Sequence, residues 1–240
     1  MPAMTFSMRV MTNPPAITDA TGANGVFSYG GSATTNNSQT DGTSITINDS
    51  KITTSKDNSG GVMVTGGGTL YGNNLTVNTA GTSSAAIRSD RGGGTLIIKG
   101  GTYKTMGKGS PSIYSTASIT VSDAKLISTA SEGVVIEGKN SVTLNNVELI
   151  DTNNQLNGLS KTYNNIFIYQ SMSGDASTGE SNFSSTDSKI TTNKGDTFYL
   201  TNTKATITLE NNTIKNNDTT GNFLRAEESS WGTSGSNGAA

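Results

Sequence analysis

The sequence contains neither cysteine nor histidine among its 240 residues. The absence of cysteine excludes disulfides and thiolate metal sites, and the absence of histidine removes imidazole catalysis and the commonest zinc ligand. Proline is scarce at 4 residues, and charged residues make up only 14%. Because disordered chains usually carry more charge, the composition favours a folded protein. Since cysteine and histidine are absent, we expect no metal site and no cofactor.

Hydrophobic residues are also few, at 31%, and no apolar run approaches the roughly 20 residues that a membrane-spanning helix needs. The net charge of −2, from 16 basic and 18 acidic residues, implies no general attraction to nucleic acid or to acidic lipid. We therefore expect neither nucleic-acid binding nor membrane insertion. The start at Met1 lacks the basic end and apolar stretch of a signal peptide, which leaves a mature fragment, a chain made by expression of a segment, or a cytosolic protein. We favour a fragment because residues 235–240 look like an arbitrary stop.

Short segments of alternating apolar and polar residues recur at a nearly constant spacing. Aligning their first apolar residues gives spacings of 25, 26, 23 and 23 residues, which is typical of a repeat architecture. The next spacing is 65 residues, and Phe183 divides it into 41 and 24. One repeat therefore carries an insertion of roughly 16 residues. The other aligned residues are Ile45, Leu70, Leu96, Ile119, Val142 and Ile207.

Each repeat contains three such segments, for example residues 118–121, 125–127 and 134–136. Connectors rich in Asn, Asp and Gly separate the first two segments and supply residues that tolerate tight bends. A propeller blade needs about 40 residues and hairpin turns, which this period does not provide. We predict an all-β fold, a right-handed single-stranded parallel β-helix (a solenoid) with three short strands per coil and about eight coils.

The domain organisation follows from this repeat. Residues 1–20 are expected to form an N-terminal cap or a degenerate coil, and residues 21–240 the β-helix domain. A polar loop insertion is expected near residues 152–164. Because alternate residues of a strand face opposite sides, Leu70, Leu96, Ile119 and Val142 are expected to stack along a narrow core.

The candidate binding residues follow inward-facing positions of the third segment. If Ile87, Ile113, Ile136, Ile168 and Leu224 point inward, their successors point outward on successive coils, with the coil of Tyr199 as an exception. Tyrosine rings stack on sugars, and Arg and Glu hydrogen-bond hydroxyls or carboxylates, so this strip is the candidate ligand-binding site. A solvated polar face with cross-strand pairs is the alternative. The strip consists of Arg88, Tyr114, Glu137, Tyr169 and Arg225.

No catalytic residue is indicated. Glycoside hydrolysis needs two carboxylates at a defined separation, and uronate lyases need a carboxylate cluster that holds Ca²⁺ beside a basic residue. The nearest approach to such a cluster is Glu132, Glu137, Glu148 and Asp151, which we interpret as a solvated face. We therefore expect that the protein is not an enzyme. The alternative is a polysaccharide lyase or glycoside hydrolase of the pectin-lyase-like class.

Several long stretches resemble a family of large, mostly uncharacterised surface or secreted β-helix proteins of Gram-positive anaerobic bacteria. The resemblance covers about residues 20–237 and rests on residues 25–31, 82–94, 107–116, 131–140, 169–176 and 223–232. It implies an adhesin-like, carbohydrate-binding repeat protein that is secreted or displayed on the cell surface, and it provides no catalytic residues to transfer.

We therefore predict a non-catalytic extracellular module, structural or adhesive, that binds glycan or another host or bacterial surface along one face. A further alternative is a filament that forms by end-to-end self-association. Solenoid ends expose unpaired strand edges, and such edges promote pairing with another copy.

Overall fold

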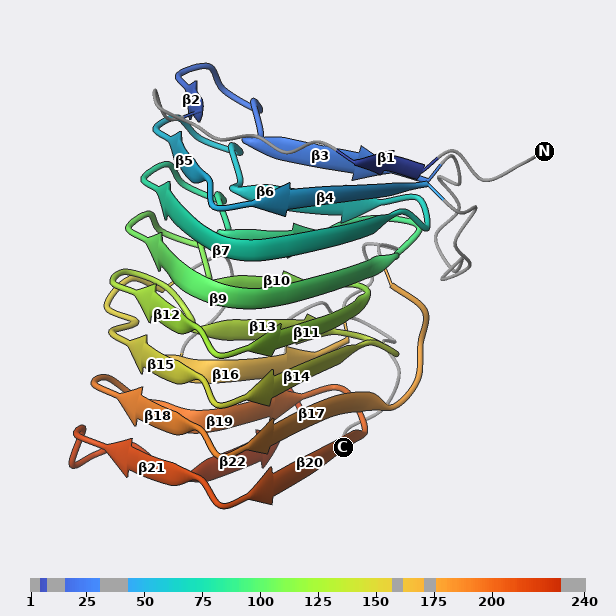
Figure 1. Ribbon diagram of the computed structural model, residues 1–240. Coiled ribbons are helices and arrows are strands. Elements are labelled where there is room, and N and C mark those ends of the chain that lie inside the picture. Colours follow the sequence, from blue (N-terminus) through green and yellow to red (C-terminus); the bar gives the residue numbers. More distant parts are fainter. Residues whose placement is uncertain (1–4, 8–15, 31–42, 157–161, 171–175, 230–240) are drawn as a thin grey trace.

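The computed structural model describes residues 5–7, 16–30, 43–156, 162–170 and 176–229. Within these ranges every regular element is a β-strand, and none is a helix. The strands stack along one axis from an N-terminal to a C-terminal coil (Figure 1). The predicted all-β class and the solenoid architecture are confirmed.

Each coil contains a first, a second and a third strand. The first strands are β1 (Thr5–Ser7), β4 (Ser44–Asn48), β11 (Ser118–Ser122), β14 (Ser141–Asn145), β17 (Ser181–Thr186) and β20 (Ala205–Glu210). The second strands are β2 (Ala16–Thr18), β5 (Lys51–Thr54), β12 (Lys125–Ser128), β15 (Glu148–Asp151), β18 (Lys189–Thr192) and β21 (Thr213–Asn216). In two coils one continuous strand covers both positions, namely β7 (Thr69–Thr79) and β9 (Thr95–Thr105). The third strands are β3 (Val26–Tyr29), β6 (Val62–Thr65), β8 (Ile87–Ser89), β10 (Ile113–Ser115), β13 (Val134–Glu137), β16 (Asn164–Tyr169), β19 (Asp196–Thr201) and β22 (Leu224–Glu227).

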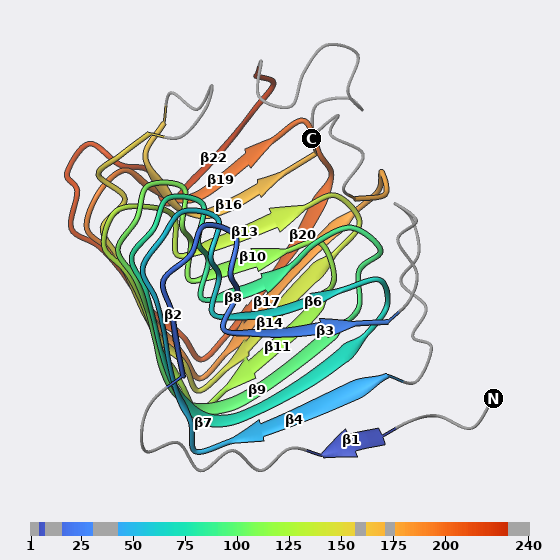
Figure 2. The ribbon, with the colours of Figure 1, turned by 90° about the horizontal axis from the view of Figure 1, so that it is seen from above.

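The coils are joined by parallel pairing alone. The first and second strands form a 14-stranded sheet, and the third strands form an 8-stranded sheet. Eight stacked strands are separated by seven steps, so the solenoid makes about seven turns over the eight predicted coils. Seen from above, with the N-terminal coil nearest, the chain runs clockwise as it recedes, which makes the solenoid right-handed (Figure 2).

The bend between the first and second strands requires a left-handed backbone. Its φ angle is +48° at Asp49, +51° at Asn74, +55° at Asp123 and +53° at Asn146. Asn and Asp adopt this conformation more readily than other L-residues because their short side chains hydrogen-bond locally. The Asn74 amide donates to the Asp49 carboxylate at 2.9 Å, and Asn146 donates to Asp123 at 2.8 Å. The Asn- and Asp-rich connectors are therefore bends, as predicted.

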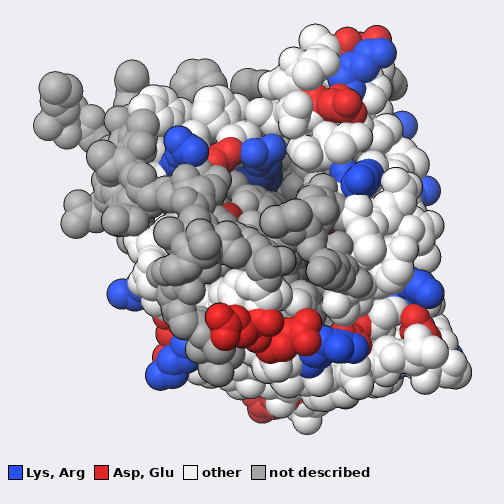
Figure 3. All heavy atoms as spheres, turned by 180° about the vertical axis from the view of Figure 1, so that it is seen from behind, with Lys and Arg blue, Asp and Glu red and all other residues white. Residues whose placement is uncertain are grey.

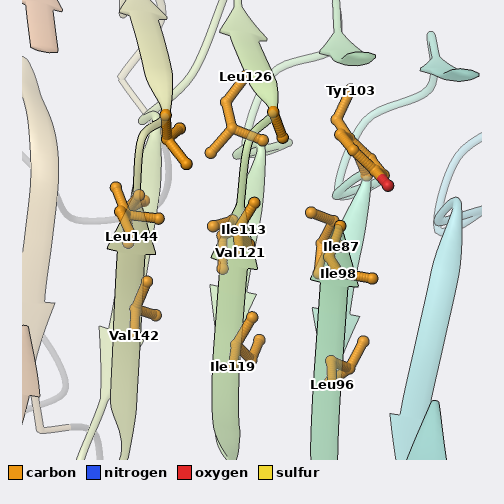
Figure 4. Close-up of a cluster of buried hydrophobic side chains, with 14 of the residues drawn as sticks. Ile87, Leu96, Ile98, Tyr103, Ile113, Ile119, Val121, Leu126, Val142 and Leu144 are labelled. Carbon is orange, nitrogen blue, oxygen red and sulfur yellow. The ribbon is translucent and has the colours of Figure 1, made fainter. Parts of the chain in front are cut away.

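The interior consists of apolar stacks that run along the solenoid axis. Leu70, Leu96, Ile119 and Val142 pair in register, and all four are fully buried. Fully burying one such side chain stabilises a fold by about 1.5–3 kcal/mol, so a narrow core suffices for a chain with few hydrophobic residues. Figure 4 shows three of these stacked rows, Leu96–Ile119–Val142, Ile98–Val121–Leu144 and Tyr103–Leu126.

The extra residues of the coil that contains β16 are divided between two connectors, 152–163 before β16 and 170–180 after it, whereas the prediction placed a single insertion near 152–164. Residues 157–161 and 171–175 lie outside the described ranges. Near the N-terminus, β1 pairs with β4 and β2 pairs with β5. These two strands therefore take first- and second-strand positions within the region expected to be a cap. The remainder of that region, residues 1–4 and 8–15, lies outside the described ranges.

Candidate functional site

The outward side of the third-strand sheet carries the predicted strip in a different register. Arg88 pairs with Tyr114, but Tyr114 then pairs with Val135. Glu137 lies two residues further along β13 and pairs with Tyr169. The expectation of a single column of side chains is therefore wrong, because they occupy two adjacent columns.

The error has a simple cause in the sequence pattern. β13 contains two inward-facing apolar residues, Val134 and Ile136, and both are fully buried. A shift of two residues keeps every side chain on the same face, so apolar alternation cannot distinguish the two registers. The first column contains Arg88, Tyr114, Val135, Phe167, Tyr199 and Arg225. The second contains Glu137, Tyr169, Thr201 and Glu227.

Glu137 joins the two columns. Its Oε2 atom accepts a hydrogen bond from the Tyr114 hydroxyl and another, at 3.0 Å, from the Tyr169 hydroxyl. The two phenol oxygens are 3.3 Å apart. Burial, followed by the proximity of Tyr169 and Glu137, raises the pKa of Tyr114 well above its ordinary value. Both phenols therefore direct their protons at Glu137 and offer a ligand mainly their acceptor lone pairs.

A ring stack lies beside this carboxylate. Phe167 stacks on Tyr169 with ring centroids 4.6 Å apart, and on Tyr199 with centroids 5.4 Å apart. All three rings are buried, and Val135 belongs to the same apolar cluster. Because the rings face one another, Tyr169 does not present the open stacking face that the strip hypothesis expected. The alternation of Phe167 and Tyr169 in β16 was a signal that this face is not simply solvated.

Arg88 stands at the edge of a pocket. Its guanidinium pairs with the Asp90 carboxylate at 2.7 Å, whereas its Nε atom is buried without a hydrogen-bond partner among the described residues. A buried donor that lacks an acceptor costs about 1–3 kcal/mol, which a ligand oxygen could offset. The pocket has a volume of about 230 Å³ and is lined by Ser83, Ala85, Arg88, Gly109, Pro111, Tyr114 and Tyr169.

Arg225 does not reach this pocket. It lies four strand steps from Tyr114 in the first column, which is roughly 19 Å at ~4.8 Å per step. Its Nε atom donates to Asp196 at 2.7 Å, and its guanidinium lies 3.9 Å from Glu227. The structure therefore brings Arg88, Tyr114, Glu137 and Tyr169 together and leaves Arg225 in a separate ion-pair network.

The four acidic residues interpreted as a solvated face are mostly buried, so that interpretation is wrong for three of them. Glu132 is 6% exposed, Glu137 1% and Asp151 0%. Glu148 alone lies on the outer surface, where Lys125 at 2.7 Å lowers its pKa. Glu132 lies in a bend, where strand alternation gives no direction, whereas Asp151 follows the alternation of β15 two residues after the inward Leu149.

Where described residues are visible on the side of the third-strand sheet, side chains of both charges are seen in small groups (Figure 3). Among the described residues, no three His, Cys, Asp or Glu side chains gather as a metal site would require. Nor does the described part of the chain contain a helix that could cross a membrane. No protein-family model, no curated protein and no solved structure matches the chain.

Proposed function

We propose that this protein is a non-catalytic extracellular binding module that recognises a glycan at the pocket formed by Arg88, Tyr114 and Tyr169. The observation that carries the proposal is the pocket lined by Arg88, Tyr114 and Tyr169, beside which the Nε donor of Arg88 is buried without a partner among the described residues. Buried polar groups are almost always paired, so an unpaired donor in a pocket favours a ligand with an acceptor oxygen. Sugar hydroxyls and uronate carboxylates both supply such oxygens.

The pocket dimensions favour a small part of a glycan. Its volume of about 230 Å³ is below the roughly 300–1,000 Å³ that is usual for small-molecule sites. A single ring or a chain end fits this space better than an extended oligosaccharide. Arg88 would donate to a ligand oxygen, and the phenol oxygens of Tyr114 and Tyr169 would accept from its hydroxyls.

The extracellular location is part of the same proposal. It is supported by the resemblance to surface or secreted β-helix proteins of Gram-positive anaerobes and by a solenoid architecture that suits an elongated, adhesin-like module. A solenoid exposes long faces along its axis, and repeat proteins use such faces for binding.

A glycan panel tests the proposal with two single variants. Arg88→Gln removes the donor, and Tyr114→Phe removes one hydroxyl while Tyr169 continues to donate to Glu137. Each lost hydrogen bond is worth about 0.5–1.5 kcal/mol, or up to 3 kcal/mol for the charged group. We therefore expect affinity for the bound glycan to fall roughly tenfold in Tyr114→Phe, and further in Arg88→Gln.

Tyr71→Phe is the matched control, because it removes one hydroxyl from an exposed ring on the outer face of the other sheet. Its affinity should equal that of the unmodified protein, and circular dichroism should show all variants folded. Unchanged affinity in Arg88→Gln and Tyr114→Phe, or no bound glycan in the panel, would contradict the proposal.

The alternative of a uronate lyase has one supporting observation, the proximity of a basic side chain and two phenols. However, Arg88 is paired with Asp90, and the raised pKa of Tyr114 disfavours the phenolate that would act as a base. Incubating bound uronates with the protein and measuring unsaturated products separates binding from cleavage. Product formation that Tyr114→Phe abolishes would favour the enzyme.

Self-association is a second candidate function. It is favoured by the open last coil, where β20, β21 and β22 pair on one side only among the described strands. Two copies that meet head to tail at such an end would continue the parallel sheets.

A further inference from the structure

A group of buried oxygen atoms lies at the corner between the second and third strands. It begins one coil beyond the glycan pocket, because the register of β10 and β13 places Glu132 opposite Pro111, which lines that pocket. Asp151 ends β15, Asn153 follows it, and Asn164 begins β16. Glu132 lies on the preceding coil, just before β13. All four residues are at least nine-tenths buried.

Asp151 occupies a position that other coils give to a hydroxyl residue. It pairs in register with Ser128 on one side and Thr192 on the other. In the preceding coil, Ser128 closes the corner by donating to the Ser131 carbonyl at 2.7 Å. A carboxylate cannot donate in this way, and Asn153 takes over this role by donating to the Asn164 carbonyl at 2.9 Å. The carboxyl group of Asp151 is therefore not needed to close the corner.

The cluster contains more acceptors than donors. Asp151 Oδ1, Asn153 Oδ1 and Asn164 Oδ1 are all buried, and none has a hydrogen-bond partner among the described residues. The Asn153 backbone N–H donates to Asp151 Oδ2 at 3.2 Å, and the Asn153 side chain lies close enough to Glu132 to act on the pKa of that carboxyl. Asn153 is thus close to both carboxyl groups.

Both carboxyl groups are buried, and among the described residues neither forms an ion pair with a lysine or arginine. Charged carboxylates in such a place need protons, a cation or ordered water, because an unpaired buried charge is costly.

We propose that the side-chain oxygens of Glu132, Asp151, Asn153 and Asn164 bind a Ca²⁺ ion. Ca²⁺ takes six to eight oxygen ligands from carboxylates, amide and backbone carbonyls and water, and it accepts irregular geometry. Mg²⁺ requires near-ideal octahedral geometry and retains several waters, which a buried corner with several protein oxygens does not favour. The cluster has two carboxylates, and amide oxygens supply the remaining protein ligands.

Calorimetric titration with CaCl₂ after removal of metal by EDTA tests the site directly. We expect binding to the unmodified protein, with a rise in thermal midpoint of roughly 5–10 °C at a free Ca²⁺ concentration about 100-fold above Kd. Asp151→Asn should lose both the heat of binding and the shift, because it keeps the shape of the side chain but removes its charge. In EDTA its midpoint should equal or exceed that of the unmodified protein, because a buried charge is absent.

Glu148→Gln is the matched control, since it removes the same charge from the outer face of the same strand, β15. It should bind Ca²⁺ like the unmodified protein. Glu132→Gln should also abolish Ca²⁺ binding. It serves as the test if Asp151→Asn does not fold. Absence of Ca²⁺ binding, equal binding by Asp151→Asn, or a response to Mg²⁺ alone would overturn the proposal.

Discussion

At the scale of single residues, buried hydroxyls determine how the protein responds to alkaline pH. Tyr103 points inward from β9 and is fully buried, and its hydroxyl donates to the Gly100 carbonyl at 3.3 Å. Burial raises the pKa of Tyr103 above its ordinary value of 10.0. The folded state therefore holds this proton at pH values where the unfolded chain releases it.

Stability should accordingly be lost as the pH rises above about 10, the pKa of tyrosine in an unfolded chain. We expect Tyr103→Phe to reduce this loss, because the variant has no proton to release on unfolding. Thermal midpoints measured by circular dichroism between pH 8 and about 11 check the prediction. Tyr71→Phe on the outer surface is the control. An equal fall in thermal midpoint at alkaline pH in Tyr103→Phe and Tyr71→Phe would contradict the prediction.

At the scale of the element, each inward residue is confined between two neighbouring coils. Ile119 of β11 is fully buried between Leu96 and Val142. Because backbone pairing fixes the distance between coils at ~4.8 Å, the site has little freedom to collapse around a smaller side chain. We expect Ile119→Ala to cost about 2–5 kcal/mol, the usual range for such truncations.

Chemical unfolding followed by circular dichroism measures this cost. Thr120→Ala lies on the same strand but on its opposite face, and its effect should stay within about 0.5 kcal/mol. If Ile119→Ala lowers the free energy of unfolding no more than Thr120→Ala does, the stacked core is not the main source of stability in these coils.

The same scale explains how much of the structure the sequence predicts. The first strands were aligned correctly from Ile45 to Ile207 because each contains an apolar alternation and a bend rich in Asn, Asp or Gly follows at a similar distance. The third strands have no such marker. In β13 and β16 two inward residues are equally apolar. The prediction therefore aligned Tyr114 with Glu137, whereas the structure pairs Tyr114 with Val135, two residues earlier. The burial of Asp151 was predictable but was missed, since Asp151 lies two residues after the inward Leu149 and aligns with the buried Ser128 and Thr192.

At the scale of the whole molecule, a solenoid is stabilised only by contacts between neighbouring coils, so its last coil lacks half of them. In the last coil described, Phe223 is 55% exposed, Leu224 46% and Leu209 36%. Leu209 pairs in register with the buried Ser185, so it occupies an inward position that no further described strand covers. Open strand edges combined with apolar side chains favour pairing with another copy.

We therefore expect the protein to self-associate through this end as its concentration rises. Leu209→Lys should shift the equilibrium toward monomer, because a charge would be buried at the contact, while its long side chain can still reach solvent in the monomer. Thr208→Lys adds the same charge to the outer face of the same strand and should leave association unchanged. Sedimentation velocity over a range of concentrations distinguishes the cases. A contact between two C-terminal ends stops at dimers, whereas a head-to-tail contact produces species that grow with concentration. A single monomeric species at every concentration would exclude both arrangements and show that this end does not mediate self-association.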